Sequence, residues 1–276
     1  MKKLLLSLFF LLASSPVLPG NEDGVSLAIA FQREVDRRLD VPPQDQVRYA
    51  QLLEEALASA GTHIMVSQYV LMVDRNPFVQ AIFVYWLDPQ LPSDRLYFIG
   101  ASPISSGKPG QYDHFITPLG AFAHSLNNMD YRAAGTPNAR GLRALGRKGM
   151  RVYDFGWVQG ERGWGHGGRE TGELGQMRLL IHSTDPVYLE KLMGIAMSKG
   201  CIRVPATLNT FIDRYGLLDS DYEQAMAKGE KFWVIRPDRV PTPWSGRYLV
   251  IVDSGSIQRP AWSPEPAAMA PAAFAQ

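Results

Sequence analysis

The sequence has little cysteine, little net charge and no long hydrophobic run. Its single cysteine, Cys201, excludes an internal disulfide, so the thiol is an intermolecular partner, an inert buried group or a reactive group. The 28 Lys and Arg residues nearly balance 27 Asp and Glu residues, which gives no reason to expect nucleic acid or an anionic membrane surface as a partner. No cluster of His, Cys and Asp has the spacing of a zinc site, and we expect neither a metal nor a cofactor.

The apolar run at the N-terminus covers only residues 4–13, after two lysines. A membrane span takes about 20 apolar residues, so this run is short for one. A basic start, a short apolar core and a break at Ser14-Ser15-Pro16 are typical of a secretory signal peptide. We therefore expect residues 1–20 to direct export to the periplasm or cell envelope, and the alternative is an uncleaved anchor.

Hydrophobic periodicity predicts a helical N-terminal segment over residues 21–62, divided at Pro42-Pro43. β-branched and aromatic runs follow, and a turn signal at residues 74–77 predicts a hairpin over residues 63–88. The other predicted strands cover residues 95–105, 114–124, 150–158, 177–184, 231–237 and 246–253, and the other predicted helices cover residues 188–197 and 206–215.

The expected fold class is therefore mainly β, with an N-terminal helical segment and short helices. The β-rich domain is expected over residues 63–253. Residues 254–276 are rich in Pro and Ala and carry no charge pattern, which predicts a disordered tail.

Two residues near Cys201 suit nucleophilic chemistry. His182 ends an apolar strand nineteen positions earlier, and the two residues can face each other across a helical connection. A free thiol has a pKa of about 8.5, so an imidazole or a positive neighbour is needed to form a thiolate near pH 7. Gly200 allows a tight turn before Cys201, and the backbone N–H groups of both residues are candidates for an oxyanion site.

This stretch resembles the signature of the L,D-transpeptidase (YkuD) family of bacterial cell-wall enzymes. That signature is a histidine, a spacer, Ser/Thr-His-Gly-Cys, an apolar residue, and Arg or Asn. Here His182 is followed, after fifteen residues, by Ser198-Lys199-Gly200-Cys201-Ile202-Arg203, with a spacer of the family's usual length. Upstream, Gly107-Lys108 and Thr117-Pro118-Leu119-Gly120 are similar to the family's Gly-Lys turn and Thr-Pro-x-Gly motif. The likeness covers residues 64–253 and implies that family's β-rich catalytic domain.

The resemblance implies a peptidoglycan stem peptide as acyl donor, with Cys201 as nucleophile and His182 as general base and acid. It also implies that the Ser183 carbonyl orients the imidazole. An amine acceptor, which could belong to an envelope protein, would give transpeptidation, and water would give carboxypeptidase action. Lys199 departs from the family, in which most members carry a second histidine there. We expect Lys199 either to support a thiolate or bind an acidic part of the substrate, or to be solvated.

Other residues are weaker candidates for contacts with the substrate. Arg203 is a candidate for a bidentate contact with a substrate carboxylate, or for a structural salt bridge. Tyr112, Thr117 and Ser198 are expected beside the donor peptide. The loop at residues 164–167 is either a lid over the site or an ordinary loop.

Two other functions stay open at this stage. The first is a hydrolase that uses the same Cys–His pair, as an L,D-carboxypeptidase or an amidase. The second is a catalytically silent binding module of the envelope with a buried cysteine. Analysis of products separates the first from a transpeptidase, and reactivity of the thiol separates the second. The sequence does not indicate an oligomeric state.

Overall fold

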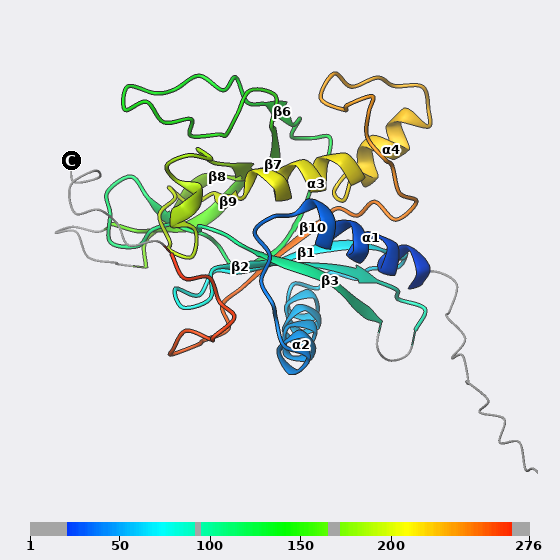
Figure 1. Ribbon diagram of the computed structural model, residues 1–276, viewed down its shortest axis with the longest axis horizontal. Coiled ribbons are helices and arrows are strands. Elements are labelled where there is room, and N and C mark those ends of the chain that lie inside the picture. The colour runs from blue at the N-terminus through cyan, green and yellow to red at the C-terminus, as the bar shows by residue number, and fades with distance from the viewer. Residues whose placement is uncertain (1–20, 92–94, 165–171, 267–276) are drawn as a thin grey trace, which may run out of the picture.

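The computed structural model of the protein describes residues 21–91, 95–164 and 172–266. Two β-sheets share one hydrophobic core, and a second core lies between the first sheet and a helix (Figure 1). This sheet-rich architecture with few helices confirms the coarse prediction of a mainly β chain with a helical N-terminal segment. No helix within the described ranges is long and apolar enough to cross a membrane. The predicted signal peptide at residues 1–20 lies outside the described residues.

The first sheet is buried on both faces at its centre. Its strand order is β3-β2-β1-β10-β5, with β1 (Gln68–Asp74), β2 (Ala81–Leu87), β3 (Leu96–Pro103), β10 (Tyr248–Val252) and β5 (Gly120–Ala123). All residues of β1 and β2 are buried, because one face packs on the second sheet and the other on α2 (Pro43–Ser59). Burial on both faces explains the continuous apolar runs. The antiparallel pairing of β1 and β2 confirms the predicted hairpin.

The second sheet has one apolar face and one polar face. Its strands are β4 (Phe115–Ile116), β7 (Arg151–Arg162), β8 (Leu174–Ser183) and β9 (Ile202–Val204), and β6 (Tyr131–Arg132) pairs with β7. In β8 the alternate residues Met177, Leu179 and Ile181 belong to the core shared with the first sheet. Because side chains alternate along a strand, Arg178, Leu180 and His182 lie on the opposite face.

The helices surround these sheets. α1 (Asn21–Glu34) packs on β3, where a Cβ at Gly100 would lie 2.3 Å from the Phe31 ring. α2 begins at Pro43, a position where proline is tolerated, so the predicted division of the N-terminal segment is confirmed. α3 (Ala206–Tyr215) matches the helix predicted over residues 206–215. α4 (Ser220–Met226) was not predicted.

The strand predicted over residues 114–124 is wrong, because the segment divides between two sheets. β4 pairs with β7 in the second sheet, and β5 pairs with β10 in the first. The chain crosses between the sheets at Thr117-Pro118, where proline has no N–H for a ladder and the Thr117 hydroxyl is hydrogen-bonded to other segments.

Two more predicted elements are wrong. Residues 188–197 contain only a short 3₁₀ turn, η1 (Glu190–Leu192), because the chain turns at Gly194 with φ of +105° and then runs beside Ser106. Residues 231–237 form turns instead of a strand. There Val234 is buried and its carbonyl accepts a bond from Arg132, so a side chain replaces the expected ladder partner.

The prediction of a disordered tail from residue 254 is wrong for residues 254–266. Trp262 packs edge-on against Tyr49 and Phe83 on the outer face of the first sheet. Its Nε1 donates to Asp45 of α2 over 2.6 Å, and the buried Ser263 hydroxyl donates to the carbonyl of Phe78. The Pro- and Ala-rich composition predicted disorder here because it does not show that a single residue, Trp262, packs into a hydrophobic site.

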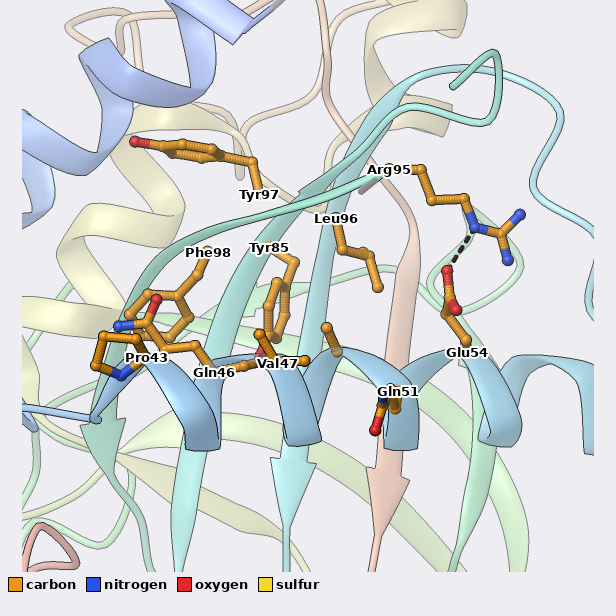
Figure 2. A pocket seen from close by; sticks show the side chains of 11 residues that line it. Pro43, Gln46, Val47, Gln51, Glu54, Tyr85, Arg95, Leu96, Tyr97 and Phe98 are labelled. Carbon is orange, nitrogen blue, oxygen red and sulfur yellow. Dashed lines mark hydrogen bonds and ion pairs between the residues drawn. The ribbon is translucent and has the colours of Figure 1, made fainter. Parts of the chain in front are cut away.

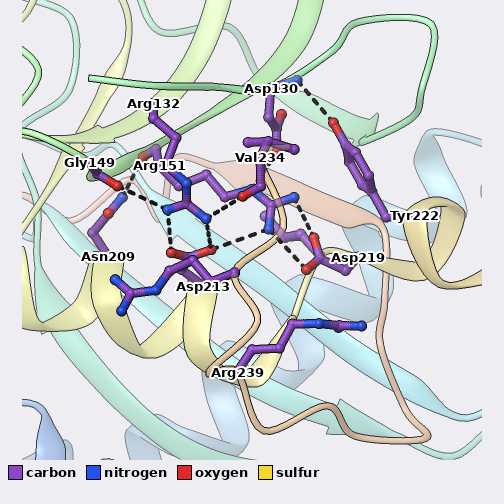
Figure 3. A network of polar contacts seen from close by, with 12 residues as sticks. Asp130, Arg132, Gly149, Arg151, Asn209, Asp213, Asp219, Tyr222, Val234 and Arg239 are labelled. Atoms are coloured by element: carbon purple, nitrogen blue, oxygen red, sulfur yellow. Dashed lines mark hydrogen bonds and ion pairs between the residues drawn. The ribbon is translucent and has the colours of Figure 1, made fainter. Parts of the chain in front are cut away.

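A buried ion network fixes β7 to the segments around α3 and α4 (Figure 3). Arg151 is completely buried, and its guanidinium bonds to Asp219 over 2.6 and 2.9 Å and to Asp130 over 2.8 Å. Arg132 pairs with Asp213 over 2.6 Å in the same network. Buried charges are tolerated when they are paired in this way.

Candidate active site

The pairing of β8 with β9 sets the candidate catalytic residues side by side. The register places His182 opposite Arg203, and Ile181 and Ile202 opposite each other in the core. Paired residues of neighbouring strands lie on the same face, so His182 and Arg203 share the polar face of the sheet. Cys201 immediately precedes β9, and its Sγ lies 3.6 Å from the carbonyl oxygen of Arg178 on β8. The thiol thus contacts β8 at Arg178 and Leu180, and His182 lies two residues beyond Leu180 on the same strand.

A tight turn delivers Cys201 to this position. Gly200 has φ of +127°, in the region that favours glycine. A Cβ there would lie 2.7 Å from Met177 Cε and 3.1 Å from Phe115 Cβ, so no other residue fits without displacement. The Thr117 hydroxyl donates to the Gly200 carbonyl and accepts from the Gly107 N–H, each over 2.8 Å. These contacts bring the Gly-Lys turn, the Thr-Pro motif and the cysteine turn into one place.

Two residues predicted to contact the donor peptide instead hold this turn. Thr117 is completely buried, and Ser198 is 1% exposed. The Ser198 hydroxyl donates to the Cys201 carbonyl and accepts from the Gly200 N–H over 3.0 Å. Both hydroxyls are therefore engaged within the turn, and direct substrate contact stays a prediction for Thr117 and Ser198. The Gly200 N–H already has an acceptor in this arrangement, so its role in an oxyanion site stays a prediction.

His182 is held as a neutral ring. Its Nδ1 lies 2.5 Å from the Ser183 carbonyl, the contact expected for orienting the imidazole. A carbonyl can only accept, so Nδ1 carries the hydrogen and Nε2 is the basic nitrogen. Burial and, to a smaller extent, the nearby Arg203 cation together lower the pKa of His182 to about 4, despite the opposing effect of the Ser183 bond.

The thiol of Cys201 is also held in its neutral form. Burial raises its pKa, and the charge of Asp154 acts in the same direction. The Leu180 N–H and the Arg203 guanidinium oppose this rise. A preformed ion pair between Cys201 and His182 is therefore not the resting state, and the cation that acts on the sulfur is Arg203.

Within the described residues, Arg203 lacks the structural salt bridge that was one of its two predicted roles. Burial lowers the pKa of its guanidinium, and within the described residues its Nε has no hydrogen-bond partner. No carboxylate in the described ranges forms a salt bridge with it, so the structural salt bridge is not found. A buried cation with a free donor beside a thiol suits stabilisation of developing negative charge on sulfur or on a bound carboxylate.

Lys199 lies in a surface ion pair. Its ammonium contacts the carboxylate of Asp113, and the two side chains are 63% and 59% exposed. This arrangement agrees with the solvated alternative and gives no contact with the thiol. Tyr112 is exposed and packs edge-on against Trp164, with ring centroids 5.6 Å apart. Most of the predicted lid, residues 165–167, lies outside the described residues.

Three residues of the polar face were missed by the sequence reasoning. Asp154 is 2% exposed and Trp157 is 65% exposed, and both lie on β7 opposite β8 residues. Arg178 lies opposite Trp157 and bonds to Asp154. For Arg178 a signal existed, because it lies four residues before His182 on a strand and therefore shares its face. The β7 residues gave no such signal.

A separate groove of about 820 Å³ lies between α2 and the strands β2 and β3 (Figure 2). Tyr85, Phe98 and Val47 line it, and the ion pair of Arg95 with Glu54 stands at one end. None of its lining residues belongs to the second sheet, so this groove is not part of the cysteine site. No group of three or more His, Cys, Asp or Glu residues suited to hold a metal ion occurs within the described ranges.

Comparison with protein-family models found no match, and comparison with curated protein sequences found none either.

Proposed function

We propose that this protein is a cysteine-dependent peptidoglycan L,D-transpeptidase of the cell envelope. It forms an acyl-enzyme with a stem peptide and transfers the acyl group to an amine in cell-wall biogenesis or remodelling. The observation that carries the proposal is the β8–β9 register, which sets His182 opposite Arg203, two residues after Cys201, with Nδ1 of His182 bonded to Ser183. The meeting of Gly107, Thr117 and Gly200 supports the same family's fold over residues 63–253.

The first half-reaction cleaves the amide between an L-centre and a terminal D-residue. Sulfur of Cys201 bonds to the carbonyl carbon while Nε2 of His182 takes the thiol proton. The tetrahedral intermediate then breaks its C–N bond, and the leaving amine takes the proton from the imidazolium. Because both groups are neutral at rest, proton transfer accompanies the attack, and Arg203 stabilises the negative charge that develops.

The second half-reaction consumes the thioester. An amine attacks the acyl carbon, Nε2 of His182 takes its proton, and the C–S bond breaks to return the thiol. Water in place of the amine gives hydrolysis by the same steps. The N–H of Cys201 lies beside its own sulfur and is the backbone donor closest to the reacting carbonyl in this scheme.

Mass spectrometry of the protein with tetrapeptide muropeptides tests the proposal. We expect an acyl adduct on the peptide that contains Cys201 and a new crosslink when an amine acceptor is present. Cys201→Ser should lose more than about 1,000-fold of turnover while keeping its fold, because serine lacks an acidic thiol. Release of the terminal residue without crosslinks would instead indicate the hydrolase. A thiol that forms no adduct and resists alkylation would indicate the silent binding module.

A further inference from the structure

A β-bulge in β7 changes which side chains share the face of the cysteine. Residues three apart on a regular strand point to opposite faces. In β7, however, Asp154 pairs with Leu180 and Trp157 pairs with Arg178, so three steps on β7 match two on β8. The bulge therefore puts Asp154 and Trp157 on one face, together with Arg178 and Leu180.

Gly156 makes the bulge possible. Its φ is +83°, and its N–H donates to Asp154 Oδ1 over 2.8 Å. A Cβ at this position would lie 2.6 Å from Asn128 Nδ2. Bulges of this kind commonly re-aim side chains beside functional sites.

Arg178 is held by one edge of its guanidinium and presents the other. Nε lies 2.8 Å from Asp154 Oδ2, and Nη2 lies 2.7 Å from the same oxygen. The guanidinium carbon lies 5.8 Å from the Trp157 ring centroid. A guanidinium has five N–H donors in a planar fork, so the Nη1–Nη2 edge remains for a ligand. No residue in the described ranges bonds to Nη1, and the side chain is 41% exposed.

The backbone of Arg178 contacts Cys201, and its guanidinium is held by Asp154, whose charge acts on the same sulfur. The carbonyl of Arg178 itself is the group 3.6 Å from Cys201 Sγ. Tyr131 lies among the same residues: burial raises its pKa, and the charges of Asp154, Cys201 and Arg178 also act on it. The thiol and the guanidinium therefore belong to one neighbourhood.

We propose that the Nη1–Nη2 edge of Arg178, backed by Trp157 and fixed by Asp154, binds a carboxylate of the peptide whose acyl group Cys201 receives. A planar monoanion suits this edge, because two parallel N–H groups match two carboxylate oxygens. The partial neutralisation of Arg178 by Asp154 disfavours a more highly charged anion such as phosphate. The identity of the ligand as an acyl donor rests on the proposed function, whereas the carboxylate preference rests on the geometry alone.

Alkylation of the single thiol tests the carboxylate preference without any turnover. Iodoacetate carries a carboxylate and iodoacetamide does not. The rate of each reaction at Cys201 is measured by mass spectrometry. At constant ionic strength, Arg178→Gln should lower the ratio of the iodoacetate rate to the iodoacetamide rate by about 3- to 10-fold. Arg95→Gln is the matched control, because Arg95 is also paired with a carboxylate and 43% exposed but lies just before β3 of the first sheet. Its ratio should not change.

The double variant Asp154→Asn with Arg178→Gln separates donor geometry from net charge. It keeps the net charge of the wild type and avoids leaving Asp154 buried without a partner. We expect its rate ratio to fall as in the single variant. An unchanged ratio in both variants, or a folded protein whose thiol neither reagent modifies, would overturn the proposal.

Donor peptides identify which carboxylate binds. The first comparison is between a tetrapeptide and the same tetrapeptide with a C-terminal amide. The second is between a peptide whose third residue has a side-chain carboxylate and a peptide whose third residue has only a side-chain amine. Arg178→Gln should reduce kcat/KM about tenfold only for donors that carry the bound carboxylate. If no donor reacts but the alkylation ratio falls, the transpeptidase function fails and the carboxylate site stands. If donors react and Arg178→Gln has the same kcat/KM as the wild type for every donor, the proposal of a carboxylate site is wrong.

Discussion

The neutral state of His182 has a direct consequence for stability. In the folded protein its pKa is about 4, below the usual 6.5, so the unfolded chain takes up a proton first as the pH falls. The contribution of neutral His182 to the free energy of unfolding is fully present above about pH 6.5 and is lost as the pH falls toward 4. The difference between the folded and unfolded pKa values corresponds to about 3 kcal/mol.

We therefore expect the free energy of unfolding to fall more steeply between pH 7 and pH 5 in the wild type than in His182→Asn. Asparagine can keep a donor near the Ser183 carbonyl but does not titrate. Urea denaturation at several pH values gives the comparison. Parallel curves for the two proteins would contradict the low pKa of His182, because other titrating groups are common to both.

Arg203, rather than His182, should control the ionisation of the thiol. Arg203→Gln removes the cation that opposes the raised pKa of Cys201, so alkylation should require a higher pH. Arg203→Lys keeps a positive charge and should shift the profile less. Removal of His182 should leave the profile nearly unchanged, because the imidazole is uncharged at rest. A large shift in His182→Ala and none in Arg203→Gln would reverse this assignment.

The turn before Cys201 depends on one hydroxyl that joins three segments. Thr117→Val has nearly the same shape but leaves the buried Gly107 N–H and Gly200 carbonyl without partners. We expect a loss of about 2–4 kcal/mol in stability, since each unsatisfied buried group costs about 1–3 kcal/mol. Thr117→Ser keeps the hydroxyl and should lose much less. Thermal denaturation measures both, and equal losses would mean that packing rather than hydrogen bonding matters at this position.

Elements with strong local patterns were predictable from the sequence. The β1–β2 hairpin and α3 follow from apolar runs and turn residues, and their bounds agree closely with the prediction. The pairing of β8 with β9 was also predictable, because a strand end and a following short strand can pair. The bulge at Gly156 was not, because it breaks the alternation from which a shared face is inferred. The roles of Thr117 and Ser198 depend on contacts between distant segments, which periodicity does not report.

At the scale of the whole molecule, the Arg151 network joins β7 to the segments around α3 and α4, which no ladder connects to β7. Arg151→Met should reduce stability by about 3–5 kcal/mol, because Asp130 and Asp219 would remain buried without their cation. Arg151→Lys keeps the positive charge but has fewer donors, so its stability should lie between those of the wild type and Arg151→Met. Calorimetry under one buffer condition measures the three proteins. A methionine variant as stable as the wild type would show that the network adds nothing to stability.

The C-terminal segment is a second device that holds the molecule together. Trp262 contacts Tyr49 of α2 and Phe83 of β2, so it ties the chain end to both an N-terminal helix and the first sheet. Trp262→Ala should cost about 2–4 kcal/mol, near the usual range for a large core aromatic. Trp262→Phe keeps part of the ring contact but loses the bond to Asp45 and should cost less. Denaturation curves that match the wild type for both variants would contradict this role.

The burial that raises the pKa of Cys201 also bears on oxidative damage. Peroxides attack the thiolate, so a sulfur kept as a thiol is oxidised slowly. A chain with one cysteine has no second thiol to trap a sulfenic acid as an internal disulfide, and further oxidation is irreversible. The neutral resting state therefore keeps the sulfur reduced, and in the proposed mechanism negative charge arises on it only when a carbonyl is in place.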